Sequence, residues 1–157
     1  MGQIIVCQCN LLLQAVWKLQ KSLMFFFFHS LVIAELQKTY GSKGFSVLAF
    51  PISDFHQELG SNKEILSFVR ETFPEVDFPI FSLNSLDNSP VYQSIKKQKP
   101  EEIVRWNFHK FLIDGNGQVV ATFDTKVNPL KISKQIEEQL EKEALQGRKK
   151  HVISWMM

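Results

Sequence analysis

The two thiols of the chain, Cys7 and Cys9, are the side chains best suited to nucleophilic or redox chemistry. They stand one residue apart in the strand-like run QIIVCQC (3–9). On a strand these i and i+2 residues point to the same face, but their Cα atoms lie roughly 6.6 Å apart, near the upper limit for a disulfide, which disfavours one between them. Cysteine reacts as the thiolate, so either residue needs surroundings that lower its pKa. The plainer interpretation is that both are buried or incidental thiols.

Two short motifs hold further polar groups that can serve a reactive sulfur. Asp54 and His56 lie in the loop of FPISDFH, and Trp106 and Asn107 lie in RWNF. An indole and an amide donate hydrogen bonds, whereas a carboxylate only accepts them. His56 either pairs with Asp54 or is solvated. The spacing of the histidines and cysteines fits no metal-ligand set, so we predict no metal site and no bound cofactor.

The elements that must position these groups follow from hydrophobic period and from capping and turn signals. A helical stripe ends at Tyr40, an apolar strand runs to Pro51, and Ser61 and Glu64 have capping-box spacing before the next helix. A strand (78–83), a short helix (SPVYQSIKKQK), a hairpin around residues 115–117 and a last amphipathic helix (132–140) follow. This alternation predicts a three-layer α/β domain with a mixed central sheet.

Composition indicates one domain of 157 residues with 45% hydrophobic residues and a net charge of +2, which is too small to predict a nucleic-acid partner. We divide the chain into an atypical apolar segment (1–30), the folded domain (31–146) and a basic, then apolar tail (147–157) that we expect to be frayed. Residues 1–30 lack acidic side chains and include Phe25–Phe28. This segment is either translated non-coding sequence, as in a splice variant, or a targeting segment.

Membrane contact through residues 22–34 stays open, although this run is shorter than the roughly 20 residues that span a bilayer. Cytoplasm and the secretory pathway (endoplasmic reticulum) are both compatible with the sequence. The ending ISWMM is not a retention signal. The oligomeric state is not predicted.

Several blocks in the same order, YGSKGFSVLAFP, QELGSNKEI, FPIFSL, PVYQSIK and RWNFHKFLIDGNGQVVATFDTKVNP, resemble the glutathione peroxidase family, most closely its cysteine-type members. The resemblance spans about Leu31 to Leu145. It implies a thioredoxin-like α/β/α fold. It also implies reduction of hydrogen peroxide or lipid hydroperoxides in the response to oxidative stress, with glutathione or thioredoxin as the reducing co-substrate.

The resemblance also assigns site residues, with departures. Trp106 and Asn107 match the hydrogen-bond donors to the thiolate and peroxide. Ile52 replaces a resolving cysteine of some members, Ser53 replaces an asparagine, and Asp54 replaces a glutamine. A carboxylate there would raise the pKa of a nearby thiol instead of lowering it. Counting back without gaps places Leu23 at the nucleophile position, and Cys9 reaches that position only if the fold accepts an insertion.

Three functions therefore stay open. The first is a catalytically impaired family member (a pseudoenzyme), which we favour, and the second is an active thiol peroxidase that uses Cys9. The third is a non-enzymatic interaction module that uses the apolar amino-terminal segment. In the implied fold the first strand is central. Either residues 3–9 fill that place, or the neighbouring strands keep open edges and the domain is destabilised.

Overall fold

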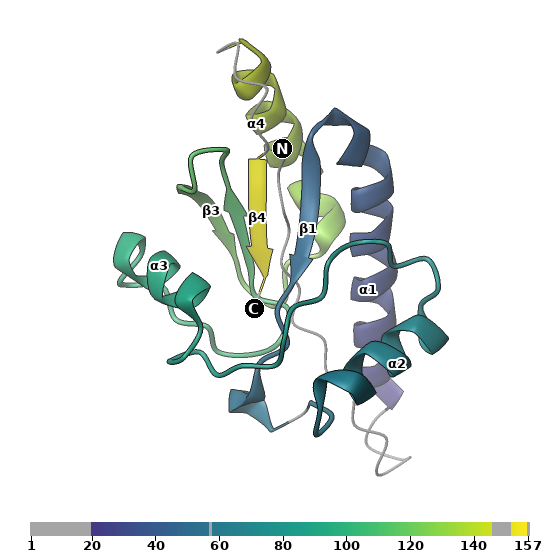
Figure 1. The fold of residues 1–157 in the computed structure, drawn as a ribbon. Helices are drawn as coiled ribbons and strands as arrows, with labels where there is room; N and C mark the ends of the chain where they lie inside the picture. The colour runs from purple at the N-terminus through teal and green to yellow at the C-terminus, as the bar shows by residue number, and fades with distance from the viewer. Residues whose placement is uncertain (1–19, 57, 146–151, 157) are drawn as a thin grey trace.

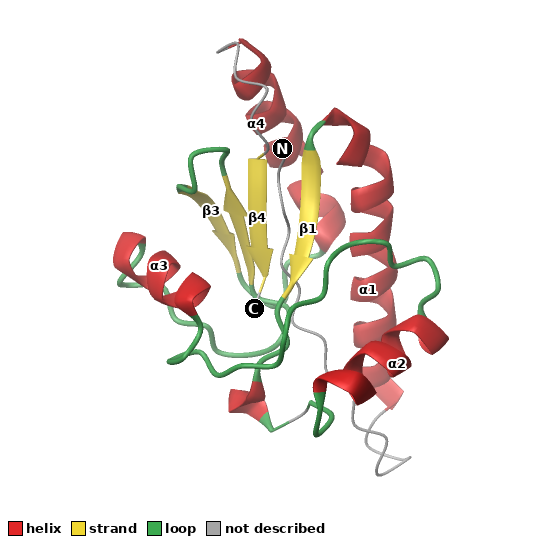
Figure 2. Ribbon diagram, in the orientation of Figure 1, coloured by secondary structure: helices red, strands yellow, loops and turns green. Residues whose placement is uncertain are grey.

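The computed structural model describes residues 20–56, 58–145 and 152–156 (Figure 1). Its helices and strands follow the predicted alternation of helix and strand (Figure 2). In chain order they are α1 (Gln20–Tyr40), β1 (Phe45–Ala49), α2 (Asn62–Thr72), α3 (Pro90–Gln98), β2 (Lys110–Ile113), β3 (Val119–Phe123), α4 (Ser133–Leu145) and β4 (Val152–Met156).

The sheet has the strand order β1-β4-β2-β3 and is mixed, as predicted. β4 runs parallel to β1 and antiparallel to β2. β2 and β3 form the predicted antiparallel hairpin, in which Gly117 adopts a φ of 83° that favours glycine.

The place between β1 and β2 is taken by the last strand of the chain. We expected the tail to be frayed, and this was wrong for Val152–Met156, which pairs on both sides. We also considered residues 3–9 for this place. They lie outside the described residues, and β4 fills the position instead. The segment is rich in β-branched and aromatic residues, which favour strands, and its pairing closes the inner edges of both neighbours.

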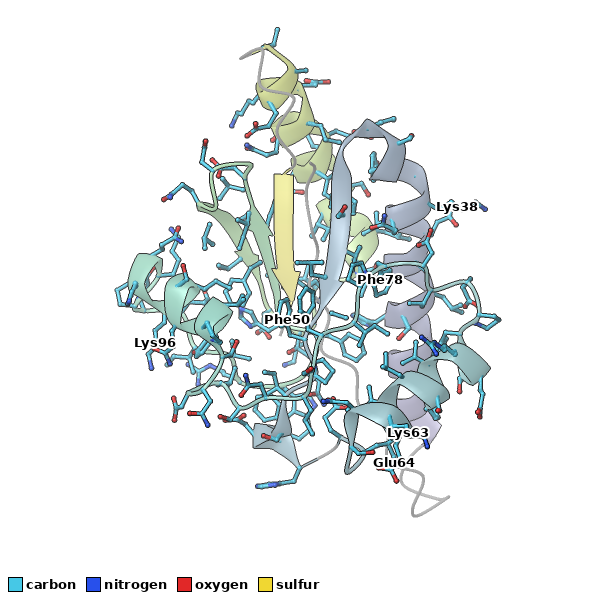
Figure 3. All side chains as sticks on the ribbon, in the orientation of Figure 1. Lys38, Phe50, Lys63, Glu64, Phe78 and Lys96 are labelled. Atoms are coloured by element: carbon cyan, nitrogen blue, oxygen red, sulfur yellow. The ribbon has the colours of Figure 1, made fainter. Side chains whose placement is uncertain are left out.

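Helices cover both faces of the sheet, which confirms the three-layer prediction (Figure 2). Successive side chains of a strand point to opposite faces. In β2, Leu112 therefore joins the core cluster under α1, α2 and α4, whereas Phe111 and Ile113 join the cluster under α3. Phe50 and Phe78 lie within the fold, while lysines such as Lys38 point outward from the helices (Figure 3).

The first helix begins earlier than predicted. We expected a helix over residues 31–40, but α1 starts at Gln20, so Leu23 is helical instead of ending a strand. The predicted boundary at residue 30 falls inside α1. Ile33 and Leu36 are buried, and the hydroxyl of Tyr40 donates to Glu137 Oε1 of α4 at 2.8 Å. Within the described residues, none of the helices combines the length and the apolar character needed to cross a membrane.

Local signals were reliable at the other helix starts. Ser61 Oγ accepts from the backbone N–H of Glu64, and Ser89 caps α3 in the same way. The predicted strand 78–83 is not formed. Ile80 of this segment and the following Asn84 make isolated bridges to Ala49 and Ile52, and Pro79 has no N–H to extend the ladder.

Candidate functional site

Three segments converge at one edge of the sheet. β1 and β4 are parallel, so their carboxyl ends lie at the same edge, and β2 begins there because it is antiparallel to β4. The register places Met156 beside both Ala49 and Lys110. The loop 51–56 leaves β1 at this edge, and the W-N-F block (residues 106–108) enters β2. The rings of Phe55 and Trp106 lie 5.4 Å apart, so the loop and the block are in contact.

The W-N-F block is held mainly by its backbone. Thr125 Oγ1 donates to the carbonyl oxygen of Asn107 at 2.7 Å and lies 3.3 Å from that of Trp106. Phe108 has a φ of 61°, an uncommon conformation that turns the chain sharply into β2. Asn107 is buried, whereas Trp106 is 47% exposed. The block therefore presents an indole at the surface from a fixed backbone.

Lys110 is a buried cation that sequence reasoning missed. Its ammonium donates to the carbonyl oxygen of Phe108 at 2.6 Å and lies 3.4 Å from that of Asp124. Burying an ammonium is costly unless it is hydrogen-bonded, and these carbonyl oxygens supply acceptors. A signal was present in the strand KFLI, because the period of two places Lys110 on the same face as the core residue Leu112.

His109 faces the opposite side of β2 and was also missed. It is 3% exposed, and its Nε2 lies 3.2 Å from Oε1 of Glu102, without the geometry of a hydrogen bond. Burial lowers the pKa of His109 below its ordinary value of 6.5, and the carboxylates of Glu102 and Asp124 oppose this shift in part. The imidazole is therefore held toward its neutral form beside the W-N-F block.

The loop after β1 is more exposed than the W-N-F block. Asp54 Oδ2 accepts from the backbone N–H of Leu86 at 2.9 Å. The N–H of Ser53 donates to Asn84, and Ile52 beneath the loop is 1% exposed. Asp54 therefore fastens its loop to the chain ahead of α3.

His56 takes no part in this arrangement. Its side chain is exposed, and its φ is 52°. In the described part of the chain no ion pair joins His56 to Asp54. The structure favours the interpretation of His56 as a solvated loop residue.

No cysteine lies among the described residues, because Cys7 and Cys9 fall outside them. The described residues likewise contain no group of histidine, cysteine and carboxylate side chains able to hold a metal ion. The structure thus brings together Trp106, Asn107 and the loop of Asp54, and it leaves the nucleophile proposed from the sequence untested.

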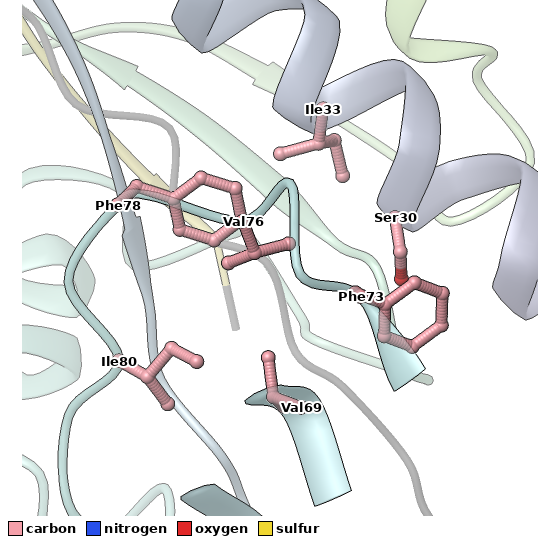
Figure 4. Close-up of a pocket in the computed structure, with 7 residues that line it drawn as sticks. All are labelled: Ser30, Ile33, Val69, Phe73, Val76, Phe78 and Ile80. Atoms are coloured by element: carbon pink, nitrogen blue, oxygen red, sulfur yellow. The ribbon is translucent and has the colours of Figure 1, made fainter. Parts of the chain in front are cut away.

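An apolar pocket between α1, α2 and residues 73–80 is too small for a substrate (Figure 4). Its cavity volume is about 10 Å³, which is near the minimum for a single water molecule. Its lining surface is apolar, and the lining residues are Ser30, Ile33, Val69, Phe73, Val76, Phe78 and Ile80. The converging edge is therefore the better candidate site.

A solved structure supports the fold. The crystal structure of Trgpx in apo form superposes with a TM-score of 0.61, at 22% sequence identity, over 89% of this chain and 81% of the other. At this identity the likeness shows the fold, which is thioredoxin-like, as the resemblance implied.

Sequence relatives extend the likeness to a family. The glutathione peroxidase family model matches residues 28–96. The chain is 38% identical over 118 residues to probable glutathione peroxidase 5 of Arabidopsis thaliana, an alignment that covers 71% of this chain and 68% of the relative. It is 36% identical over 116 residues to the glutathione peroxidase-like peroxiredoxin HYR1 of Saccharomyces cerevisiae, covering 69% of this chain and 71% of the relative.

A third relative, the chloroplastic phospholipid hydroperoxide glutathione peroxidase of Pisum sativum, is 40% identical over 115 residues. That alignment covers 69% of this chain but 48% of the relative, so the chain matches about half the length of that protein. The extent of these alignments, together with the shared fold, shows that the chain belongs to the glutathione peroxidase family.

Proposed function

We propose that this chain keeps the peroxidase scaffold of its family but is impaired in the reduction of hydroperoxides. The observation that carries the proposal is the identity of the strand between β1 and β2. Its residues, VISWM, include no cysteine, and its carboxyl end lies at the edge where the loop after β1 meets the W-N-F block. By resemblance, the strand in this position leads to the nucleophile. Among the described residues, this strand therefore brings no thiol to the edge.

The reaction implied by the family makes the need for that thiol explicit. A thiolate sulfur attacks one peroxide oxygen, the O–O bond breaks, and the departing oxygen is protonated to water or an alcohol. The sulfur becomes a sulfenic acid. A reducing thiol such as glutathione then forms a mixed disulfide with release of water, and a second thiol restores the cysteine. Every step passes through a sulfur at the site.

The loop residue Asp54 supports the same proposal. A carboxylate offers acceptors to its surroundings, and its charge disfavours a neighbouring thiolate. In this chain one of its oxygens accepts from Leu86, so the residue has a role in holding the loop. Trp106 and Asn107 remain as the hydrogen-bond donors that a peroxide or thiolate would meet.

The occupied sheet position also bears on Cys9 as an alternative nucleophile. To act from the family position, Cys9 would have to end a strand between β1 and β2. That place is filled by β4, whose ladder extends along both neighbours. An active peroxidase that uses Cys9 in this way therefore requires β4 to leave.

The test is peroxide reduction by the purified chain, with hydrogen peroxide or a lipid hydroperoxide and with glutathione or a thioredoxin system as reductant. We expect a rate no higher than that of free cysteine at twice the molar concentration of protein, since the chain has two thiols. A faster rate that Cys9→Ser abolishes, while Cys7→Ser does not, would establish the active peroxidase instead.

Trp106→Phe serves as the matched control. If the site does not function, this substitution leaves the background rate unchanged, because the indole N–H then serves no reacting atom. A fall in rate with retained secondary structure would show that the indole acts on a working sulfur and would contradict the proposal.

A further inference from the structure

β4 joins the fold through strand pairing along both of its edges. Five of its residues are in register with β1, and four are in register with β2. Both partners are remote in the chain, and residues 146–151 alone separate β4 from α4. The strand is therefore a separable element with one covalent connection to the other described elements.

Leaving the position of β4 empty would cost a large free energy. The side chains of the flanking strands are nearly all buried, including Val47 of β1 and Phe111 of β2. Removal of β4 would leave a row of unpaired N–H and C=O groups along each strand, in the interior of the sheet. Buried backbone groups without partners are strongly disfavoured, so an emptied position captures another strand.

We infer that this position takes the β4 segment of a second copy of the chain, which gives a dimer by reciprocal strand exchange. The same five residues in the same register reproduce every backbone pair of the closed monomer. The identical segment of the second copy can pair in parallel with β1 and, at the same time, antiparallel with β2. The free energies of the two forms then differ mainly in the entropy of association and in the connection at 146–151.

Concentration decides between the two forms. A short connection holds the chain's own β4 at an effective concentration of the order of millimolar. Folding at micromolar concentration therefore favours the closed monomer. Refolding near millimolar concentration lets the β4 of another copy compete, and the exchanged dimer persists after dilution because its release requires two central strands to unpair.

Cross-linking of full-length protein tests the exchange without any reference to peroxidase activity. In a Cys7→Ser, Cys9→Ser background, we introduce Val47→Cys and Ser154→Cys, two nearly isosteric changes at residues paired in register. Adjacent strands lie about 4.8 Å apart, within the Cα separation that a disulfide tolerates. The protein is refolded at about 1 µM and about 1 mM, oxidised, and analysed on non-reducing gels and by mass spectrometry.

Two differently tagged copies of this variant are mixed before refolding. We expect an internal disulfide at the low concentration. At the high concentration we expect a disulfide-linked dimer in which the linked peptides come from different copies. Internal disulfides alone at both concentrations would overturn the inference, as would the absence of any 47–154 disulfide. Ser154→Cys with Thr122→Cys is the matched control, because β3 does not adjoin β4 and this pair should not link. Dimer that still forms in a Ser154→Pro variant would show that association does not depend on β4, again overturning the inference.

Discussion

The W-N-F block and the loop after β1 form the two sides of the same edge, yet they are built differently. The block rests on hydrogen bonds to its carbonyl oxygens from Thr125 and from the buried ammonium of Lys110. Ser53, Asp54 and His56 of the loop are exposed, and the loop's contacts with Leu86 and Asn84 lie near the surface. By the resemblance, the side that matches the family's residue types is also the side whose backbone supports β2.

It follows that the match of Trp106 and Asn107 to the hydrogen-bond donors of the family, which the resemblance implies, is weak evidence for catalysis. The backbone of the block is part of the support of β2, so its sequence is constrained by folding. The loop carries Ser53 and Asp54, which by the resemblance replace an asparagine and a glutamine, and the exposure of these two side chains lets them change at small cost in stability. If the comparison holds, equivalent substitutions should destabilise the block far more than the loop.

The largest expected effect is from Phe108→Ala, set against Phe55→Ala. Phe108 is 3% exposed in the core, whereas Phe55 is half-buried and its ring meets that of Trp106 in a tilted contact. Loss of a buried phenylalanine costs about 3–5 kcal/mol, and the loop variant should lose no more than about 1.5 kcal/mol. Urea unfolding followed by circular dichroism measures both. Equal losses would mean that the loop is as well anchored as the block.

A smaller effect is expected for Thr125→Val, set against Ser53→Ala. Thr125→Val removes the donor to the carbonyl of Asn107, a partly buried contact of 2.7 Å, and should cost about 1 kcal/mol. Ser53 Oγ makes an exposed contact of 3.2 Å with Asn84, so its loss should cost less than about 0.5 kcal/mol. The same unfolding experiment applies, and a greater loss in Ser53→Ala would reverse the comparison.

The smallest expected effect is a pH dependence of stability that comes from His109, the residue next to the block. Burial keeps the pKa of His109 below 6.5, so below pH 6.5 the unfolded chain gains a proton that the folded chain resists. The free energy of unfolding should therefore fall as the pH drops from about 6.5 toward the folded pKa, with a slope under about 1.4 kcal/mol per pH unit.

His109→Gln should flatten this part of the stability curve. Denaturant midpoints between pH 7 and pH 5 provide the measurement. A slope that persists in His109→Gln would assign the proton to another group.

Local chemistry made much of the fold predictable. Ser61 and Ser89 marked helix starts, glycines marked the hairpin, and the period of Ile132 and Ile136 marked the last helix. Those signals lie within a few residues of the structure that they specify. The resemblance to the family then supplied the order of the layers.

Which segment forms the strand between β1 and β2 could not be predicted from local signals. Five residues with strand character, VISWM, can pair with any strand edge in a matching register. Their neighbouring sequence does not indicate which strands they pair with. The start of α1 was missed because the Phe25–Phe28 run has no helical period, so only the continuing backbone pattern reveals the helix. Lys110 was missed because a cation is ordinarily assigned to the surface.

The late place of β4 in the chain has a consequence for biosynthesis. β1 is made roughly a hundred residues before its neighbour β4, which at 5–20 residues per second amounts to about 5–20 s on the ribosome. Once β2 has also been made, and until β4 follows, the position between them is empty and two hydrophobic strand edges are open to other polypeptides. Newly made chains should therefore depend on chaperones until translation delivers the closing segment.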